Sequence, residues 1–103
     1  MIRQHLRFDI DKIKRQVRPY DFYSKEQSIN RFGYSSRGWL TAGLCPFHED
    51  SSTGSFKIHQ ESGAYICFSC GIKGGDVIDF LQKKYNLSFK EAIAKLKDEW
   101  RIV

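Results

Sequence analysis

Two closely spaced pairs of metal-binding residues constrain this 103-residue chain more than any other feature. The first pair is Cys45 and His48, the second is Cys67 and Cys70, and each pair encloses two residues. Thiolate sulfur and imidazole nitrogen are ligands that Zn²⁺ prefers, and two such pairs separated by room for two strands are typical of four-ligand structural sites. The pattern therefore predicts one structural Zn²⁺ ion, with no coordination position left for water.

We call residues 45–48 knuckle 1 and residues 67–70 knuckle 2. Gly71 directly follows knuckle 2, and a glycine there can adopt the positive φ that such turns need and bring backbone N–H groups near the sulfur atoms. His48 is expected to be neutral, with one ring nitrogen on the metal and the other donating to a nearby oxygen atom.

Two other interpretations of the cysteines remain open at this point. Cys67 and Cys70 alone would fit a dithiol redox pair, or the thiols could be buried and unreactive. Redox pairs of the thioredoxin type lack a second Cys-x-x-His pair and lie in a βαβ unit, so zinc is favoured. Three cysteines leave no basis for a disulfide framework, which favours a reducing cytoplasm.

The charge balance favours nucleic acid as a partner. Seventeen Lys and Arg oppose twelve Asp and Glu, a net charge of +5, and aromatic residues reach 15%. Cations neutralise phosphates and rings stack on unpaired bases, although basic small domains also bind acidic proteins. No apolar run reaches the length of a membrane span, and the first residues lack a signal-peptide core, so no membrane partner is expected.

The pattern of elements predicts an α+β fold in a single domain covering residues 1–103, with its zinc core at about 38–76. Alternating polar and apolar residues predict antiparallel strands at 39–44, 55–59 and 64–67. A loop or edge strand is expected before them. The strands would form a small zinc ribbon, with the metal at one end of the sheet.

Helices are expected before and after the ribbon in the sequence, and the C-terminal helices are expected to pack on one face of the sheet. The N-terminal extension, residues 9–23, should begin with Asp9 as the N-cap, and Pro19 should close that helix or open a new turn. Two C-terminal helices are predicted over 76–100, where an apolar stripe follows Asp76 and a capping box begins the second helix.

Catalysis by this chain alone is not expected. The acidic pairs are explained by loop solvation, helix N-terminal charge or exposed helix ends. No Ser/His/Asp set is visible, and the glycine-rich stretch 71–75 lacks the Lys-Ser/Thr ending of a phosphate-binding loop.

The candidate nucleic-acid contacts are the outward residues of the predicted sheet. Cations and rings that alternate on an open sheet suit single-stranded DNA. Four residues are expected to line one exposed face and two to lie at its edges, namely Lys57, His59, Trp39 and Tyr65, with Arg37 and Lys73 at the edges. For Trp39 and Tyr65, burial in the core is an equally good interpretation.

Short motifs occur in order between about Gly38 and Leu96: Cys45-Pro46-Phe47-His48, Ser55-Phe56, Tyr65-x-Cys67-Phe68-x-Cys70-Gly71, Gly75-Asp76-x-Ile78-Asp79-Phe80 and Phe89-x-Glu91-Ala92. Together they closely resemble the N-terminal CHC2 zinc-binding domain of bacterial DnaG-type and phage or plasmid primases. The resemblance implies that Cys45, His48, Cys67 and Cys70 are zinc ligands. It also implies that Lys57 lies on the strand nearest to the single-stranded template.

The chain departs from this family in two places. The family usually has Thr-Pro-Ser-Phe where this chain has Thr53-Gly54-Ser55-Phe56. Such primases also make primers with a Toprim-type domain, and this chain ends at Val103 before such a domain could begin. The resemblance thus implies an accessory module that assists RNA primer initiation in DNA replication, with a catalytic domain or a helicase in cis or in trans.

Two alternative functions remain at the level of the sequence. A protein-docking ribbon that recruits a replication or transcription protein would be favoured by exposed apolar surface around Phe80, Tyr85 or Trp100. A transcriptional regulator would instead prefer a defined double-stranded site.

Overall fold

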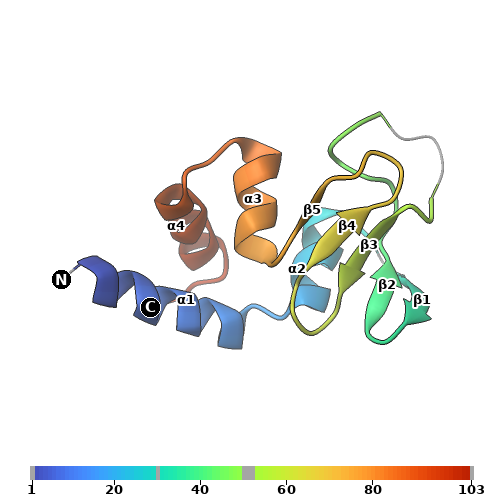
Figure 1. Ribbon diagram of the computed structural model, residues 1–103. Coiled ribbons are helices and arrows are strands. Elements are labelled where there is room, and N and C mark those ends of the chain that lie inside the picture. The colour runs from blue at the N-terminus through green and yellow to red at the C-terminus, as the bar shows by residue number, and fades with distance from the viewer. Residues whose placement is uncertain (1, 30, 50–52, 103) are drawn as a thin grey trace.

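A computed structural model describes residues 2–29, 31–49 and 53–102. The molecule is elongated, 45 × 24 × 21 Å, with a sheet at one end and three helices at the other (Figure 1). The N- and C-terminal ends both lie at the helical end, and the short helix α2 lies beside the sheet.

The sheet is a simple antiparallel meander in the order β1-β2-β3-β4-β5. Its strands are β1 (Gly33–Ser36), β2 (Trp39–Thr41), β3 (Phe56–His59), β4 (Tyr65–Cys67) and β5 (Lys73–Gly74). The strands predicted at 55–59 and 64–67 are confirmed. The strand predicted at 39–44 ends early, because the chain turns at Gly43 (φ +69°) and leaves Leu44 46% exposed. The two-residue strand β5 was missed, since it is too short to show an alternating pattern.

The helices are α1 (Ile2–Gln16), α2 (Pro19–Glu26), α3 (Val77–Tyr85) and α4 (Phe89–Glu99). The prediction that Asp9 caps the first helix is wrong. The helix begins at Ile2, and Asp9 lies inside it, where its carboxylate forms an ion pair with Lys97 at 3.2 Å. No helix within the described ranges has both the length and the apolar composition needed to span a membrane.

The other helix ends follow local chemistry as predicted. Pro19 opens α2, because its fixed φ suits the first helical position. Asp76 caps α3 by accepting a hydrogen bond from the Asp79 N–H at 2.8 Å. The capping box of Ser88 and Glu91 begins α4, with both of its hydrogen bonds present.

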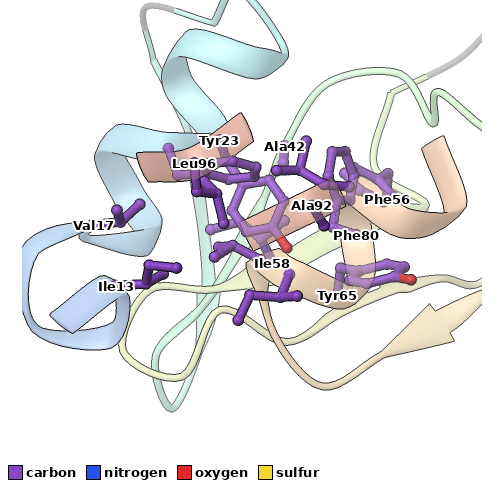
Figure 2. Close-up of a cluster of buried hydrophobic side chains, with 14 of the residues drawn as sticks. Ile13, Val17, Tyr23, Ala42, Phe56, Ile58, Tyr65, Phe80, Ala92 and Leu96 are labelled. Carbon is purple, nitrogen blue, oxygen red and sulfur yellow. The ribbon is translucent and has the colours of Figure 1, made fainter. Parts of the chain in front are cut away.

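An aromatic core joins the sheet to the helices (Figure 2). Phe80 of α3 is its common partner, with ring centroids 5.0 Å from Tyr23, 5.3 Å from Tyr65 and 5.8 Å from Phe22. These three contacts are close to perpendicular, the arrangement that ring quadrupoles favour. The helices α2 and α3 therefore cover the face of the sheet that bears Tyr65, and the opposite face stays open.

Both buried tyrosine hydroxyls have a partner. Tyr23 Oη donates to the Gly63 carbonyl at 2.7 Å, and Tyr65 Oη donates to the Asp79 carboxylate at 2.7 Å. Burial raises the pKa of Tyr23 well above its ordinary value. Burial, and then the hydrogen bond to Asp79, raise the pKa of Tyr65. Gly74 is required beside this pair, because a Cβ there would overlap the Tyr65 ring and the Asp79 carboxylate.

Candidate metal centre and the open face of the sheet

The two knuckles meet at one end of the sheet and bring four ligand residues together. The ligand atoms of Cys45, His48, Cys67 and Cys70 all lie within 4.8 Å of one another. Cys67 is the last residue of β4 and lies opposite Phe56 in the register, so β3 and β4 set the position of knuckle 2. Knuckle 1 reaches the same place through the turn that follows β2.

The spacing of these atoms fits a tetrahedral Zn²⁺ ion. Cys45 Sγ lies 3.9 Å from Cys70 Sγ, and Cys67 Sγ lies 3.4 Å from His48 Nε2. A tetrahedron with Zn–S of about 2.3 Å and Zn–N of about 2.0 Å has S···S edges of about 3.8 Å and S···N edges of about 3.5 Å. Four protein ligands fill that tetrahedron, so the site is a structural zinc site of the Cys3His type.

His48 has the tautomer that zinc binding needs. Its Nδ1 lies 2.9 Å from the Glu49 carbonyl oxygen, which can only accept a hydrogen bond, so Nδ1 carries the proton. The lone pair of Nε2 then faces the sulfur atoms. The expected oxygen partner of the second ring nitrogen is thus the backbone of the next residue.

Backbone hydrogen bonds connect knuckle 2 to the residues before and after it in the sheet and close its turn. The Cys67 N–H donates to the Ile72 carbonyl at 2.9 Å, and the Phe68 N–H donates to the Ser55 carbonyl at 2.9 Å. Gly71 adopts φ +82°, as predicted, and its N–H donates to the Cys67 carbonyl at 2.8 Å. The knuckle is therefore fastened to the start of β3 and to the approach to β5.

The two buried thiols have opposite tendencies to ionise. Burial raises the pKa of Cys45, although the Phe47 N–H lies 3.4 Å from its sulfur and lowers it in part. Burial also acts to raise the pKa of Cys67, but hydrogen bonds from the backbone N–H groups of Cys70 and Ser69 act against it, and the pKa is lowered. The N–H groups that stabilise this thiolate are those that the turn of knuckle 2 provides.

The open face of the sheet carries a row of residues that lie directly opposite one another. The register pairs Thr41 with Lys57, Lys57 with Ile66, and Ile66 with Lys73. Directly opposed residues share a face, so these side chains lie on the side away from the aromatic core. Trp39 pairs with His59 at the next position on this face, ring against ring with centroids 5.2 Å apart.

A hollow of about 330 Å³ lies on this face, lined by Ser35, Ser36, Trp39, Lys57, Ile66 and Phe68. Lys57 Nζ donates to Ser35 Oγ at 2.8 Å and lies 5.7 Å from the centre of the Phe68 ring. The ammonium group is thereby held at the side of the hollow, between a hydroxyl and an aromatic face.

The residues predicted to contact nucleic acid on this face differ in exposure and in hydrogen bonding. Lys57 and Trp39 line the hollow, Lys73 is exposed on β5, and Arg37 is exposed in the turn between β1 and β2. His59 faces outward but is engaged by backbone. Its Nδ1 accepts from the N–H groups of the turn after β3, and its Nε2 donates to the Arg37 carbonyl at 3.0 Å.

The expectation that Tyr65 lines the exposed face is wrong. Tyr65 is 1% exposed and lies on the core face, opposite Ile58 in the register. The outward residue of β4 is Ile66, because side chains alternate along a strand and Cys67 has to face the metal. The ring contacts with Phe80 and Phe47 place Tyr65 inside the aromatic core.

Phe68 is the residue of this face that the sequence reasoning missed. It is 67% exposed, which is unusual for a phenylalanine, and it lies between two metal ligands. Its position carried a usable signal. When the flanking Cys67 and Cys70 both turn toward the ion, the residues they enclose tend to point away from it.

Comparison with known proteins gives one family. A family model described as the CHC2 zinc finger matches residues 7–103. The chain is 41% identical over 91 residues to a DNA primase of Mycolicibacterium smegmatis, and 39% identical over 87 residues to a DNA primase of Thermotoga maritima. These matches cover 88% and 84% of this chain but 13% and 14% of the relatives, so the chain spans about one seventh of their length.

A solved structure agrees with the sequence relatives. Part of a crystal structure of the zinc-binding and RNA polymerase domains of the Aquifex aeolicus primase resembles this fold, with a TM-score of 0.68 at 27% identity. The match covers 90% of this chain and 21% of that chain.

Proposed function

This chain belongs to the CHC2 zinc-finger family, and from that premise we propose that it is the zinc-binding part of a DNA primase, which holds single-stranded template on the open face of its sheet. The observation that carries the proposal is the hollow between Trp39 and Phe68. It offers two rings and a cation on a surface that no helix covers. Aromatic surfaces of this kind take unpaired bases at about 1–3 kcal/mol per stacked base.

The zinc ion has a structural role in this proposal. When bound, it joins the two knuckles and sets the edge of the sheet on which Phe68 stands. Lys57 acts as a positioning residue, because its ammonium group is already shared between Ser35 and the Phe68 ring. Phosphate contacts on this face then come from Arg37 and Lys73, which are exposed at its edges.

We further propose that primer synthesis itself belongs to other residues, in cis or in trans. The chain corresponds to about one seventh of its relatives, and it matches only 21% of an Aquifex aeolicus primase chain that contains a zinc-binding domain and an RNA polymerase domain. A catalytic domain or a helicase would be the protein partner. Three zinc-bound thiolates also favour a reducing compartment such as the cytoplasm.

The alternative of a protein-docking module receives no support at the three positions named for it. Phe80 is fully buried. Tyr85 is 44% exposed, but Lys95 Nζ lies 4.8 Å from its ring centre and its hydroxyl donates to Glu26. Trp100 is half-buried beneath Lys25 Nζ at 5.6 Å. Cations cover both partly exposed rings, so these residues do not form an apolar patch.

The proposal is tested by binding a labelled single-stranded oligonucleotide to the zinc-loaded protein, measured by fluorescence anisotropy. Phe68→Ala is expected to raise Kd by about 5- to 150-fold, the equivalent of about 1–3 kcal/mol for one stacked base. Phe68→Trp should retain binding. The matched control is Phe89→Ala, which removes a partly exposed ring from α4, away from the sheet.

Equal affinity of the wild type for single strands and duplex, together with no effect of Phe68→Ala, would contradict the proposal. Unchanged zinc content and unfolding temperature in each variant would show that the fold is intact.

A further inference from the structure

The excess positive charge of this chain does not lie on the zinc ribbon. Residues 33–76, which include the sheet and both knuckles, contain three Lys or Arg and four Asp or Glu, a net charge of −1. Residues 1–18 contain six Lys or Arg and two Asp, a net charge of +4 out of +5 for the chain. The segment that includes α1 therefore supplies most of the charge that could attract a polyanion.

The geometry of α1 gathers several of these cations on its solvent side. Ile13 and Val17 face the core, with 0% and 2% exposure. Arg15 is two residues from each of them, on the opposite side of the helix. Arg7 and Lys14 are two turns apart and share a flank. Arg18 lies just after α1, in extended backbone before α2, and lines a surface hollow with Tyr20, Asp21 and Glu61.

We call the four exposed cations Arg7, Lys14, Arg15 and Arg18 the basic strip. In the part of the chain that the structure describes, no ion pair joins any of them to a carboxylate. Asp11 is exposed one turn from both Arg7 and Arg15, and Asp21 and Glu61 line the hollow beside Arg18. Figure 1 shows α1 at the helical end of the molecule, away from the strands of the sheet.

We propose that the basic strip is a second nucleic-acid contact, which binds the sugar-phosphate backbone without reading bases. This inference adds a surface to the proposed function and can hold or fail independently of it. Arg7 and Arg15 lie about 12 Å apart along the helix at 1.5 Å per residue, and Arg18 follows just beyond its end, a length that several phosphates of one strand can follow.

The composition of the strip favours a nucleic acid over an acidic protein. Protein interfaces depend on a few buried apolar or aromatic anchors, whereas phosphate contacts need cations alone. The exposed large apolar residues among the described side chains are Tyr20, Tyr34, Leu44, Phe68, Tyr85 and Phe89, and none lies at residue 7 or within residues 9–16 of α1. Tyr20 comes nearest in sequence, and its ring is already packed against Phe32, with centroids 4.7 Å apart.

The test is the salt dependence of oligonucleotide binding by the zinc-loaded protein. Each neutralised phosphate contributes about 0.7 to the slope of log K against log[salt] for single strands. The double variant Lys14→Gln/Arg15→Gln is therefore expected to reduce the slope by about 1.4. This corresponds to about 25-fold weaker binding at 0.1 M salt if the two proteins bind equally at 1 M.

The matched control is Lys90→Gln/Arg31→Gln, which removes two exposed cations from α4 and from the loop before β1. It should change the slope little. The strip variant should also weaken binding to a 20-base-pair duplex, because phosphates are present there as well, whereas Phe68→Ala should not. Duplex binding that depends on the strip would support the strip even if the open face fails.

Three results would overturn the inference. The first is a strip variant whose slope and affinity equal those of the wild type, whatever Phe68→Ala does. The second is a control variant whose affinity for the oligonucleotide falls as much as that of the strip variant. The third is binding of poly-glutamate, at matched charge and salt, as tight as binding of the oligonucleotide, which would assign the strip to an acidic protein surface.

Discussion

Knuckle 1 and knuckle 2 share a local design, a phenylalanine between two metal ligands, and place that ring in opposite environments. In knuckle 1, Phe47 turns inward, with its ring centroid 5.8 Å from Tyr65 and 5.4 Å from Phe80. In knuckle 2, Phe68 is 67% exposed beside Lys57. Ligand spacing thus sets the turn and the direction of the ligands. The rings also occupy different positions in the two turns, since Phe47 directly precedes the second ligand and Phe68 directly follows the first. Each ring then packs according to what lies beside its turn.

The contrast suggests a division of labour between the knuckles. Knuckle 1 attaches the metal site to the aromatic core through Phe47. Knuckle 2 is attached by backbone hydrogen bonds to Ser55 and Ile72, so its ring does not pack into the core and stays 67% exposed beside Lys57. The predictions below concern stability and begin with the largest expected effect.

Removal of the metal is expected to abolish the contrast by unfolding both knuckles. Zinc binding contributes about 10–16 kcal/mol in small zinc-finger peptides, as much as the whole stability of a typical domain, about 5–15 kcal/mol. Chelation, or Cys67→Ala, should therefore melt the ribbon. Circular dichroism and a thermal scan would detect this, and added Zn²⁺ should restore the chelated wild type but not the variant. An unfolding temperature unchanged after zinc is removed would contradict this role of the site.

Truncation of the two rings is expected to affect stability to different extents in the two knuckles. Phe47→Ala should reduce the free energy of unfolding by about 3 kcal/mol, near the lower end for buried phenylalanines, because Phe47 is only half-buried. Phe68→Ala should change it by less than about 0.5 kcal/mol, as is usual for exposed side chains. Urea unfolding of the zinc-loaded proteins measures both values. Equal losses would show that the two rings are equivalent.

Tyr65→Phe tests the residue on which Phe47 of knuckle 1 packs. Its expected effect on the free energy of unfolding is smaller. Loss of its hydrogen bond to Asp79 should cost about 1 kcal/mol, since Asp79 keeps its ion pair with Lys83 at 3.1 Å. Burial raises the pKa of Tyr65, so its contribution is complete below the unfolded value of about 10 and is lost as pH rises above it. The free energy of unfolding should decrease between about pH 8 and pH 10.5 in both proteins, and it should decrease less in the variant than in the wild type. An identical decrease in both proteins would argue against this burial.

The sequence was sufficient wherever a feature depends on neighbours a few residues apart. The ligand pairs, the positive φ of Gly71, the Asp76 cap and the capping box of Ser88 were all predictable, because each is a turn or helix end closed by local hydrogen bonds. The start of α1 was not predictable from Asp9. That carboxylate has a partner in α4, Lys97, which no local pattern reveals.

The sequence was not sufficient to predict which side chains lie on the open face of the sheet. Alternation placed Lys57 outward but did not show the register by which Tyr65 turns inward and Ile66 outward. The charge total did not show that most of the net charge lies in residues 1–18, although a count by segment does. The structure adds which of these cations are exposed on the solvent side of α1.

The amino-acid sequence by itself determined that this chain builds a Cys3His zinc site within a small ribbon, because ligand type and spacing are local properties of two short turns. The tertiary structure decided that Phe47 is half-buried against the aromatic core while Phe68 is 67% exposed. Burial depends on residues brought together from distant parts of the chain, among them Tyr65 and Phe80 beneath Phe47, and sequence neighbours do not encode those contacts.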